Sequence, residues 1–260
     1  MKSILSALAA VLLVLWGGSL VAQSESRTAL VIGNAAYSGP NAGLRNPVND
    51  ARDIAATLKD LNFGVTLLED ANHESMRRAI REFEDALRRR KGVSFLYFAG
   101  HGVQLGGHNY LMPVGAGLVR ETDVRQRTVD ANELIERLRE TGSRLNIVVL
   151  DACRNNPLYK PMIVTRGSRP EGLAPFMPAS GTLIAFATEP GRVASDGAAD
   201  RGLYAKYLVK FMRTAGLPLE QVFKRVREVV VEESRGGQTP VEFSTLTGAD
   251  FYFSPPPATR

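Results

Sequence analysis

Short apolar runs alternate with longer amphipathic segments along the chain, and this alternation constrains the fold more than any other feature. Five of the apolar runs are rich in Val, Ile, Leu and Phe, as are strands that are buried on both faces of a sheet. These runs are Thr28–Ile32, Gly64–Leu68, Val93–Phe98, Leu145–Leu150 and Gly181–Ala187. Strands that alternate with crossover helices form α/β folds, so the pattern predicts a mostly parallel central sheet flanked by helices.

The segments between these strands carry apolar residues at helical spacing. Asn49–Leu61 follows Pro47, a typical residue at the start of a helix. Glu74–Arg90 has one apolar face, and its arginines alternate with acidic residues elsewhere, which favours a solvated face over a binding patch. The remaining predicted elements are helices at Ala131–Arg139, Tyr204–Met212 and Pro218–Glu233, and a closing strand at Asp250–Phe253.

The first apolar run, Ile4–Trp16, has the length of a signal-peptide core and is shorter than the roughly 20 residues of a membrane-spanning helix. Ala22 is a small residue suited to cleavage before Gln23. We therefore interpret residues 1–22 as a signal peptide and expect an exported protein, periplasmic or secreted, with no membrane span after cleavage. Left uncleaved, the segment would be an anchor, and a buried core helix is the remaining alternative.

Charge and cysteine content exclude several classes of protein. The 32 basic and 27 acidic residues leave a formal charge of +5, an excess too small and too dispersed to indicate a nucleic-acid partner. Cys153 is the only cysteine, which rules out an intramolecular disulfide and argues against a cysteine-based zinc site. We expect no metal or other cofactor in the reaction itself.

Cys153 follows the predicted strand Leu145–Leu150, and the longest stretch without periodicity begins directly after it. Long loops of this kind are usually functional, and open α/β sheets place their sites at the carboxyl ends of strands. A free cysteine can also be only a small buried apolar residue. The polar neighbours Asp151 and Arg154 favour a reactive thiol instead.

A thiol needs a base to act as a nucleophile at neutral pH, and histidine is the usual one. His101 ends a predicted strand within a Gly-His-Gly sequence, so we expect it at the same sheet edge as Cys153. His73 starts an amphipathic segment, where we expect a cap or a solvent-facing side chain, and His108 follows two glycines in a predicted hairpin tip. The backbone amide of Gly102 would be free to donate to a developing oxyanion.

The order and spacing of the two reactive groups give the sequence a family resemblance. Asp151-Ala152-Cys153-Arg154 lies about 50 residues after His101, and the caspase signature is Gln-Ala-Cys followed by Arg, Gln or Gly, with its histidine about 50 residues upstream. The chain resembles the caspase-like cysteine peptidases of clan CD (peptidase C14 type), and most closely their bacterial metacaspase-like, or orthocaspase, branch. The likeness also includes the segments Ala29–Asn34, Asn46–Ala51, Phe98–Gly102 and Leu246–Phe253.

The resemblance implies a caspase-hemoglobinase fold in a peptidase domain at residues 23–260, with its core at about 27–253. It implies that His101 and Cys153 form a catalytic dyad and that the amides of Gly102 and Cys153 form the oxyanion hole. Protein or peptide substrates follow from the same resemblance.

Two further family properties concern calcium and self-processing. Many metacaspases require calcium, but Glu121 and Asp123 are too few acidic groups to define a site here. Family members often cleave themselves, and the loop after the cysteine carries Arg166 and Arg169 among Pro and Gly residues. We expect self-cleavage after one of these arginines, and the alternative is an uncut loop that shapes the substrate pocket.

The residue two positions before the cysteine predicts the substrate preference. Caspases have Gln there and select Asp, whereas this chain has Asp151, whose carboxylate would repel an acidic side chain. The resemblance to metacaspases assigns a second pocket carboxylate to Asp50, which could instead be a helix N-terminal residue. Two carboxylates predict cleavage after Arg, then Lys, because the guanidinium binds carboxylates bidentately.

Three other functions remain as alternatives. A catalytically silent caspase-fold protein acting as a binding or regulatory module would normally lose one residue of the pair, and both are present here. A cysteine amidase acting on small molecules would explain the thiol without the Gly-His-Gly strand end. A redox role lacks a resolving cysteine.

Overall fold

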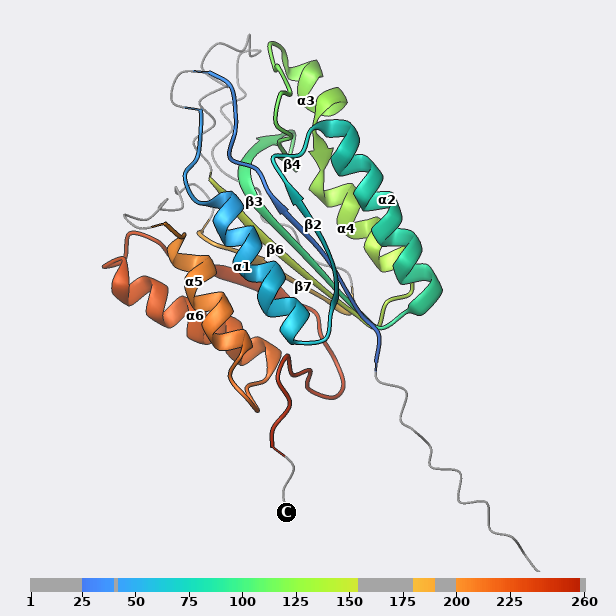
Figure 1. Ribbon diagram of the computed structural model, residues 1–260, viewed down its shortest axis with the longest axis vertical. Helices are drawn as coiled ribbons and strands as arrows, with labels where there is room; N and C mark the ends of the chain where they lie inside the picture. Colours follow the sequence, from blue (N-terminus) through green and yellow to red (C-terminus); the bar gives the residue numbers. More distant parts are fainter. Residues whose placement is uncertain (1–24, 40–41, 154–179, 190–199, 258–260) are drawn as a thin grey trace, which may run out of the picture.

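The computed structural model describes residues 25–39, 42–153, 180–189 and 200–257 (Figure 1). The export segment expected at residues 1–22 and the candidate cleavage sites Arg166 and Arg169 lie outside the described residues. No helix within the described part of the chain is both long enough and apolar enough to cross a membrane.

A central sheet with the strand order β2-β1-β3-β6-β7-β8 organises the fold (Figure 1). The first five of these strands pair in parallel, and β8 is antiparallel to β7, so the predicted α/β class is confirmed. Their bounds are β1 Arg27–Gly33, β2 Gly64–Glu69, β3 Val93–Leu105, β6 Leu145–Cys153, β7 Thr182–Phe186 and β8 Val241–Ser244. The chain leaves β1 in one direction to form β2 and in the other to form β3, and such a reversal is where open α/β sheets bind ligands.

Helices cover both faces of the sheet (Figure 1). One face carries α1 Pro47–Asp60, α5 Leu203–Met212 and α6 Leu219–Glu233, and the other carries α2 His73–Arg90 and α4 Ala131–Glu140. These five helices lie where the periodicity predicts them. The short helix α3 Glu121–Arg127 was not predicted.

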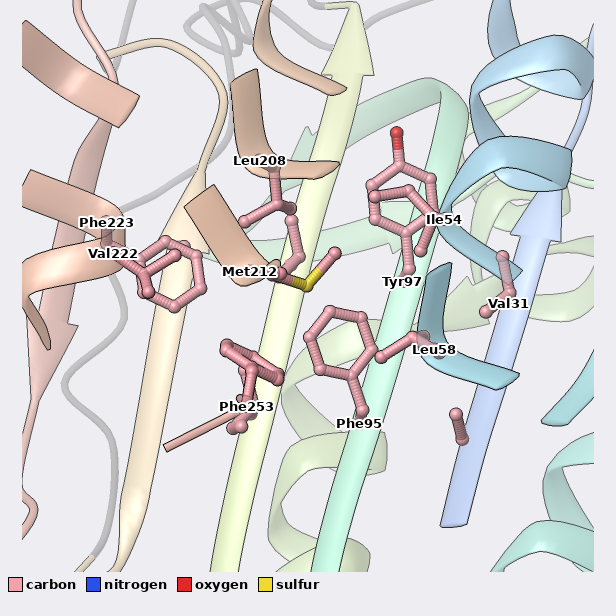
Figure 2. Close-up of a cluster of buried hydrophobic side chains, with 14 of the residues drawn as sticks. Val31, Ile54, Leu58, Phe95, Tyr97, Leu208, Met212, Val222, Phe223 and Phe253 are labelled. Atoms are coloured by element: carbon pink, nitrogen blue, oxygen red, sulfur yellow. The ribbon is translucent and has the colours of Figure 1, made fainter. Parts of the chain in front are cut away.

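Side-chain alternation along β3 supplies both cores. Phe95 and Tyr97 pack against α1 and α5 on the first face, whereas Leu96 and Phe98 face α2 and α4. Figure 2 shows the first core, in which the Tyr97 ring lies beside Ile54 and its hydroxyl points toward the carboxyl end of the strands. The only polar atom of this side chain is thus aimed at the edge where a site is expected.

Strand β3 is longer than the predicted run Val93–Phe98 and continues to Leu105. It then turns through Gly106 and Gly107, both with positive φ, into β4 His108–Leu111, which pairs with β5 Val129–Asp130. The predicted hairpin at His108 is confirmed, because paired residues with positive φ are what a two-residue hairpin turn requires.

The predicted closing strand Asp250–Phe253 is wrong. Only Tyr252 makes a bridge there, to Pro218, and the final strand of the sheet is β8. The carbonyl oxygens of Phe253 and Tyr252 instead accept hydrogen bonds from the Arg27 guanidinium, at 2.9 and 3.1 Å. Phe251 and Phe253 alternate like the inward-facing residues of a strand because both bury their rings in the first core. The segment that carries them nevertheless pairs with no strand of the sheet that the structure describes.

Candidate active site

His101 and Cys153 meet at the carboxyl end of the two central strands. They are the last register partners of the parallel pair β3–β6, after Ala99–Asp151 and Gly100–Ala152. Neighbouring strands lie about 4.8 Å apart, so the two backbone positions are adjacent. The expected meeting of the histidine and the cysteine at one sheet edge is therefore what the topology produces.

The His101 imidazole is buried and has a defined tautomer. Its Nε2 atom lies 2.7 Å from the carbonyl oxygen of Ala42. Because a carbonyl only accepts hydrogen bonds, Nε2 must carry the proton, which leaves Nδ1 as the basic nitrogen of the neutral ring. The loop after β1 thus fixes which nitrogen of His101 can take a proton.

Tyr37 supports the same histidine from a second direction. Its ring lies 4.4 Å from the imidazole, centroid to centroid, and its hydroxyl accepts a 3.0 Å hydrogen bond from the His101 amide. The hydroxyl donates in turn to the Met112 carbonyl at 2.9 Å. Gly100 permits this approach, since a Cβ atom there would lie 2.5 Å from the Tyr37 hydroxyl.

Gly102, the expected oxyanion donor, continues β3 directly after His101 and pairs with Leu111 of β4. This pairing belongs to the antiparallel hairpin, whereas His101 belongs to the parallel sheet. The Gly-His-Gly segment is therefore the point at which β3 passes from one set of partners to the other.

Asp151 lies at the same edge and is held by a buried phenol. The Tyr97 hydroxyl donates to its Oδ2 atom at 3.0 Å, and Tyr97 is fully buried whereas Asp151 is half-buried. Hydrogen bonding to a carboxylate favours its charged form. The arrangement therefore keeps a negative charge at a partly accessible position two residues before the cysteine.

Asp50 lies in the first turn of α1, as the helix N-terminal interpretation predicts, and it is buried. Its two carboxylate oxygens accept the Gly202 amide hydrogen at 2.9 and 3.1 Å, which attaches α1 to the start of α5. Burial, followed by the charges of Asp151 and Asp50, raises the pKa of Tyr97 well above 10. Both carboxylates are thus close enough to act on the same phenol.

The other expected site residues, Glu121 and Asp123, belong to α3 and not to the strands that carry His101 and Cys153. Asp123 accepts hydrogen bonds from the amides of Val119 and Arg120 at the start of α3, and these bonds lower its pKa. Glu121 occupies the first turn of the same helix. Within the part of the chain that the structure describes, no group of three or more His, Cys, Asp or Glu side chains is arranged to hold a metal ion.

His73 and His108 are also remote from the cysteine strand. His73 begins α2 and is partly exposed, whereas the capping side chain is that of Asn72, which accepts the Ser75 amide. Of the two roles expected for His73, a cap or a solvent-facing side chain, the cap is therefore wrong. His108 begins β4, and its Nδ1 lies 2.7 Å from Asp130. Of the three histidines, only His101 pairs in register with Cys153.

Comparison with known proteins now decides the family. The family model described as the caspase domain matches residues 26–252. The chain belongs to the caspase family of cysteine peptidases. Proteins of this caspase family act on protein substrates, and the mostly parallel sheet flanked by helices is the caspase fold.

Individual relatives agree with this assignment. The chain is 31% identical over 137 residues to human mucosa-associated lymphoid tissue lymphoma translocation protein 1, and 30% identical to its mouse homolog. The match covers 52% of this chain but only 16% of each relative. The crystal structure of the Drosophila initiator caspase Dronc superposes with a TM-score of 0.61 at 14% identity, covering 88% of this chain and 85% of Dronc.

Three features of this caspase-family site were missed in the sequence. The Ala42 carbonyl that orients His101 is a backbone group, so no residue type indicates it. Tyr37 acts across a loop whose conformation the sequence does not specify. Tyr97 did carry a signal, since it is a hydroxyl-bearing residue in an otherwise apolar predicted strand and needs a partner when buried.

Proposed function

We propose that this chain is an exported cysteine endopeptidase of the metacaspase-like branch, and that it cleaves after Arg and less readily after Lys. The observation that carries the proposal is the register pairing of His101 with Cys153 at the carboxyl end of β3 and β6. Two groups suited to nucleophilic catalysis are adjacent there on rigid strands, and a single-residue difference in strand pairing would separate them.

The proposed mechanism uses the tautomer that Ala42 imposes on His101. Nδ1 accepts the Cys153 thiol proton, and the thiolate attacks the carbonyl carbon of the scissile peptide bond. The imidazolium then protonates the departing amine, which leaves a thioester on Cys153. His101 next takes a proton from water, the hydroxide attacks the thioester, and the returning proton restores the thiol.

The amides of Gly102 and Cys153 would donate to the oxyanion of each tetrahedral intermediate. One such donor is typically worth about 3 to 4 kcal/mol of transition-state stabilisation. Gly102 directly follows His101 on β3, and Cys153 ends β6. Both amides therefore belong to the strand ends that carry the dyad, which supports the assignment.

Substrate preference in this proposal depends on Asp151 and Asp50. The Tyr97 hydroxyl holds the Asp151 carboxylate in place, and the Gly202 amide holds that of Asp50. A substrate guanidinium would bind these carboxylates favourably, and an aspartyl side chain would be repelled.

The proposal includes export and processing. Removal of residues 1–22 would give an amino terminus at Gln23, which mass spectrometry of the exported chain should detect. Intact Met1 in a soluble cytoplasmic fraction would contradict export. Cleavage after Arg166 or Arg169 would accompany activation. A wild-type enzyme that remains uncut while fully active would show that this cleavage is unnecessary.

The decisive experiment measures hydrolysis of fluorogenic peptides that end in Arg, Lys or Asp. We expect Cys153→Ala and His101→Ala each to reduce Arg-peptide hydrolysis to background, because the thiol and its base act as a unit. His73→Ala and His108→Ala are matched controls that should keep most activity. A folded wild-type protein with no hydrolysis, but with retained peptide binding, would indicate a silent binding module instead.

A further inference from the structure

A cavity of 620 Å³ opens on the face of the sheet that α2 and α4 cover, opposite the face on which Asp50 and α1 lie. The residues that line it belong to helices α2, α3 and α4 and to strands β4 and β5 and the residue before β5. Figure 1 shows where α2, α3, α4 and β4 lie in the fold. The residues that decide its chemistry are four arginines, Arg77, Arg81, Arg125 and Arg137, and three acids, Glu84, Asp130 and Glu133. None of them belongs to the proposed catalytic site.

The acidic residues of the cavity are already neutralised or capped. Glu84 is buried and accepts a 2.8 Å hydrogen bond from Arg137, with Arg88 at 3.7 Å on its other oxygen. Asp130 lies 2.7 Å from His108 and also caps α4 by accepting the Asn132 amide.

Glu133 is the third acid, and it is exposed. Its carboxylate lies 3.8 Å from the same Arg137 guanidinium that binds Glu84. Arg137 therefore contacts two of the three acids, and the four arginines of the wall exceed its three acids by one positive charge. The other three arginines are not paired with these acids.

Those three arginines, Arg77, Arg81 and Arg125, form no ion pair with any carboxylate of the described residues. Arg77 and Arg81 are one turn apart on α2, where like charges destabilise a helix. Arg125 reaches the cavity from α3 and donates to the Tyr110 hydroxyl at 3.3 Å. Burial, followed by the charge of Arg77, lowers the pKa of His73 in the same wall.

We propose that this cavity binds a small anion with more than one phosphate group, held by Arg77, Arg81 and Arg125. The guanidinium fork matches phosphate oxygens bidentately, and three forks on two helices exceed what one phosphate needs. The volume is within the range of about 300 to 1,000 Å³ that small-molecule sites occupy. Either an inorganic polyphosphate or a nucleoside triphosphate supplies this chemistry.

Binding is measured on the full-length chain by titration calorimetry, with tripolyphosphate and ATP as separate probes and citrate as a carboxylate anion. We expect tripolyphosphate to bind and citrate to bind at least tenfold more weakly. ATP tighter than tripolyphosphate would assign a nucleotide, and equal or weaker ATP would assign a polyphosphate. No binding by either phosphate probe at millimolar concentration, or citrate as tight as tripolyphosphate, would overturn the proposal.

Variants on the same helix provide the matched control. Arg77→Gln with Arg81→Gln should weaken tripolyphosphate binding by about tenfold or more, since charge-assisted hydrogen bonds are lost. Arg78→Gln with Arg89→Gln removes the same charge from exposed positions of α2 outside the cavity and should change affinity less than twofold. Equal losses in both double variants would show diffuse attraction to α2. Arg125→Gln tests the contribution of the third arginine, which lies on α3, and should also weaken tripolyphosphate binding.

Discussion

The acidic edge around Asp151 and the arginine cavity around Arg77 differ in how their charged groups are partnered. Asp151 and Asp50 accept hydrogen bonds from a phenol and an amide, which stabilise a carboxylate without cancelling its charge. In the cavity, a guanidinium binds Glu84, an imidazole contacts Asp130, and the arginines outnumber the acids by one. The charge that each site presents to a ligand therefore depends more on which groups its charged residues bind than on how many charged residues it contains.

Among the substitutions that test this comparison, Asp151→Asn should have the largest effect, because it keeps the shape of the side chain and removes its charge. We expect kcat/KM for an Arg peptide to fall about 100-fold or more, because a desolvated substrate guanidinium loses its counter-charge. Arg77→Gln with Arg81→Gln should leave this value unchanged. Undiminished Arg cleavage by the Asp151 variant would mean that the pocket has been assigned to the wrong carboxylate.

A smaller effect is expected for Tyr97→Phe, which removes only the donor to Asp151. Hydrogen bonds to charged groups contribute about 1.5 to 3 kcal/mol, so we expect roughly a tenfold loss in kcat/KM for the Arg peptide. Without its donor the Asp151 pKa should rise, and the acid limb of the kcat/KM profile should move to higher pH.

Tyr204→Phe is the matched control for that substitution. Tyr204 is also buried, and its hydroxyl forms no hydrogen bond with any residue that the structure describes. Its loss should change kcat/KM less than twofold and leave the pH profile in place. Equal effects of the two substitutions would show that packing, and not the hydrogen bond, is responsible.

The smallest expected effect is on alkaline stability. Burial and nearby carboxylates, with Asp151 first among them, raise the pKa values of Tyr97 and Tyr204 well above 10. Above pH 10 the unfolded chain therefore releases protons that the folded chain keeps, so the free energy of unfolding falls as pH rises. At pH 10.5 each phenol accounts for roughly 1 kcal/mol of this loss.

Denaturant unfolding at pH 9 and pH 10.5 measures that difference. Wild type should lose more stability over this interval than Tyr97→Phe, and the double variant with Tyr204→Phe should lose least. The same loss in all three proteins would mean that other groups of the chain control the alkaline transition.

Much of the fold was predictable because buried parallel strands and amphipathic helices leave strong periodic signals. Strand β8 was missed because Val241–Ser244 is short and half-polar, as suits an edge strand. The extension of β3 was missed because Gly100 and Gly102 interrupt its apolar run. Local sequence patterns thus identify elements that pack on the core and fail where glycine or exposure weakens the pattern.

For the site, the sequence predicts which residues reach the sheet edge but not what orients them. His101 and Cys153 end recognisable strands, so their meeting follows from parallel pairing. The Ala42 carbonyl and the contact between Asp50 and Gly202 join segments far apart in the chain. Such contacts depend on loop conformation, which residue type does not specify.

The contacts of the Arg27 guanidinium determine at which end the domain could be attached to a membrane or to another domain. It donates hydrogen bonds to the carbonyls of Tyr252 and Phe253 and packs on the Phe251 ring at 4.9 Å, so the first strand and the segment Phe251–Phe253 are joined at one end of the molecule (Figure 1). That end is the amino end of the sheet, whereas His101 lies at the opposite edge. A lipid tether or a neighbouring domain joined to this end of the molecule would therefore lie at the opposite end of the sheet from His101 and Cys153.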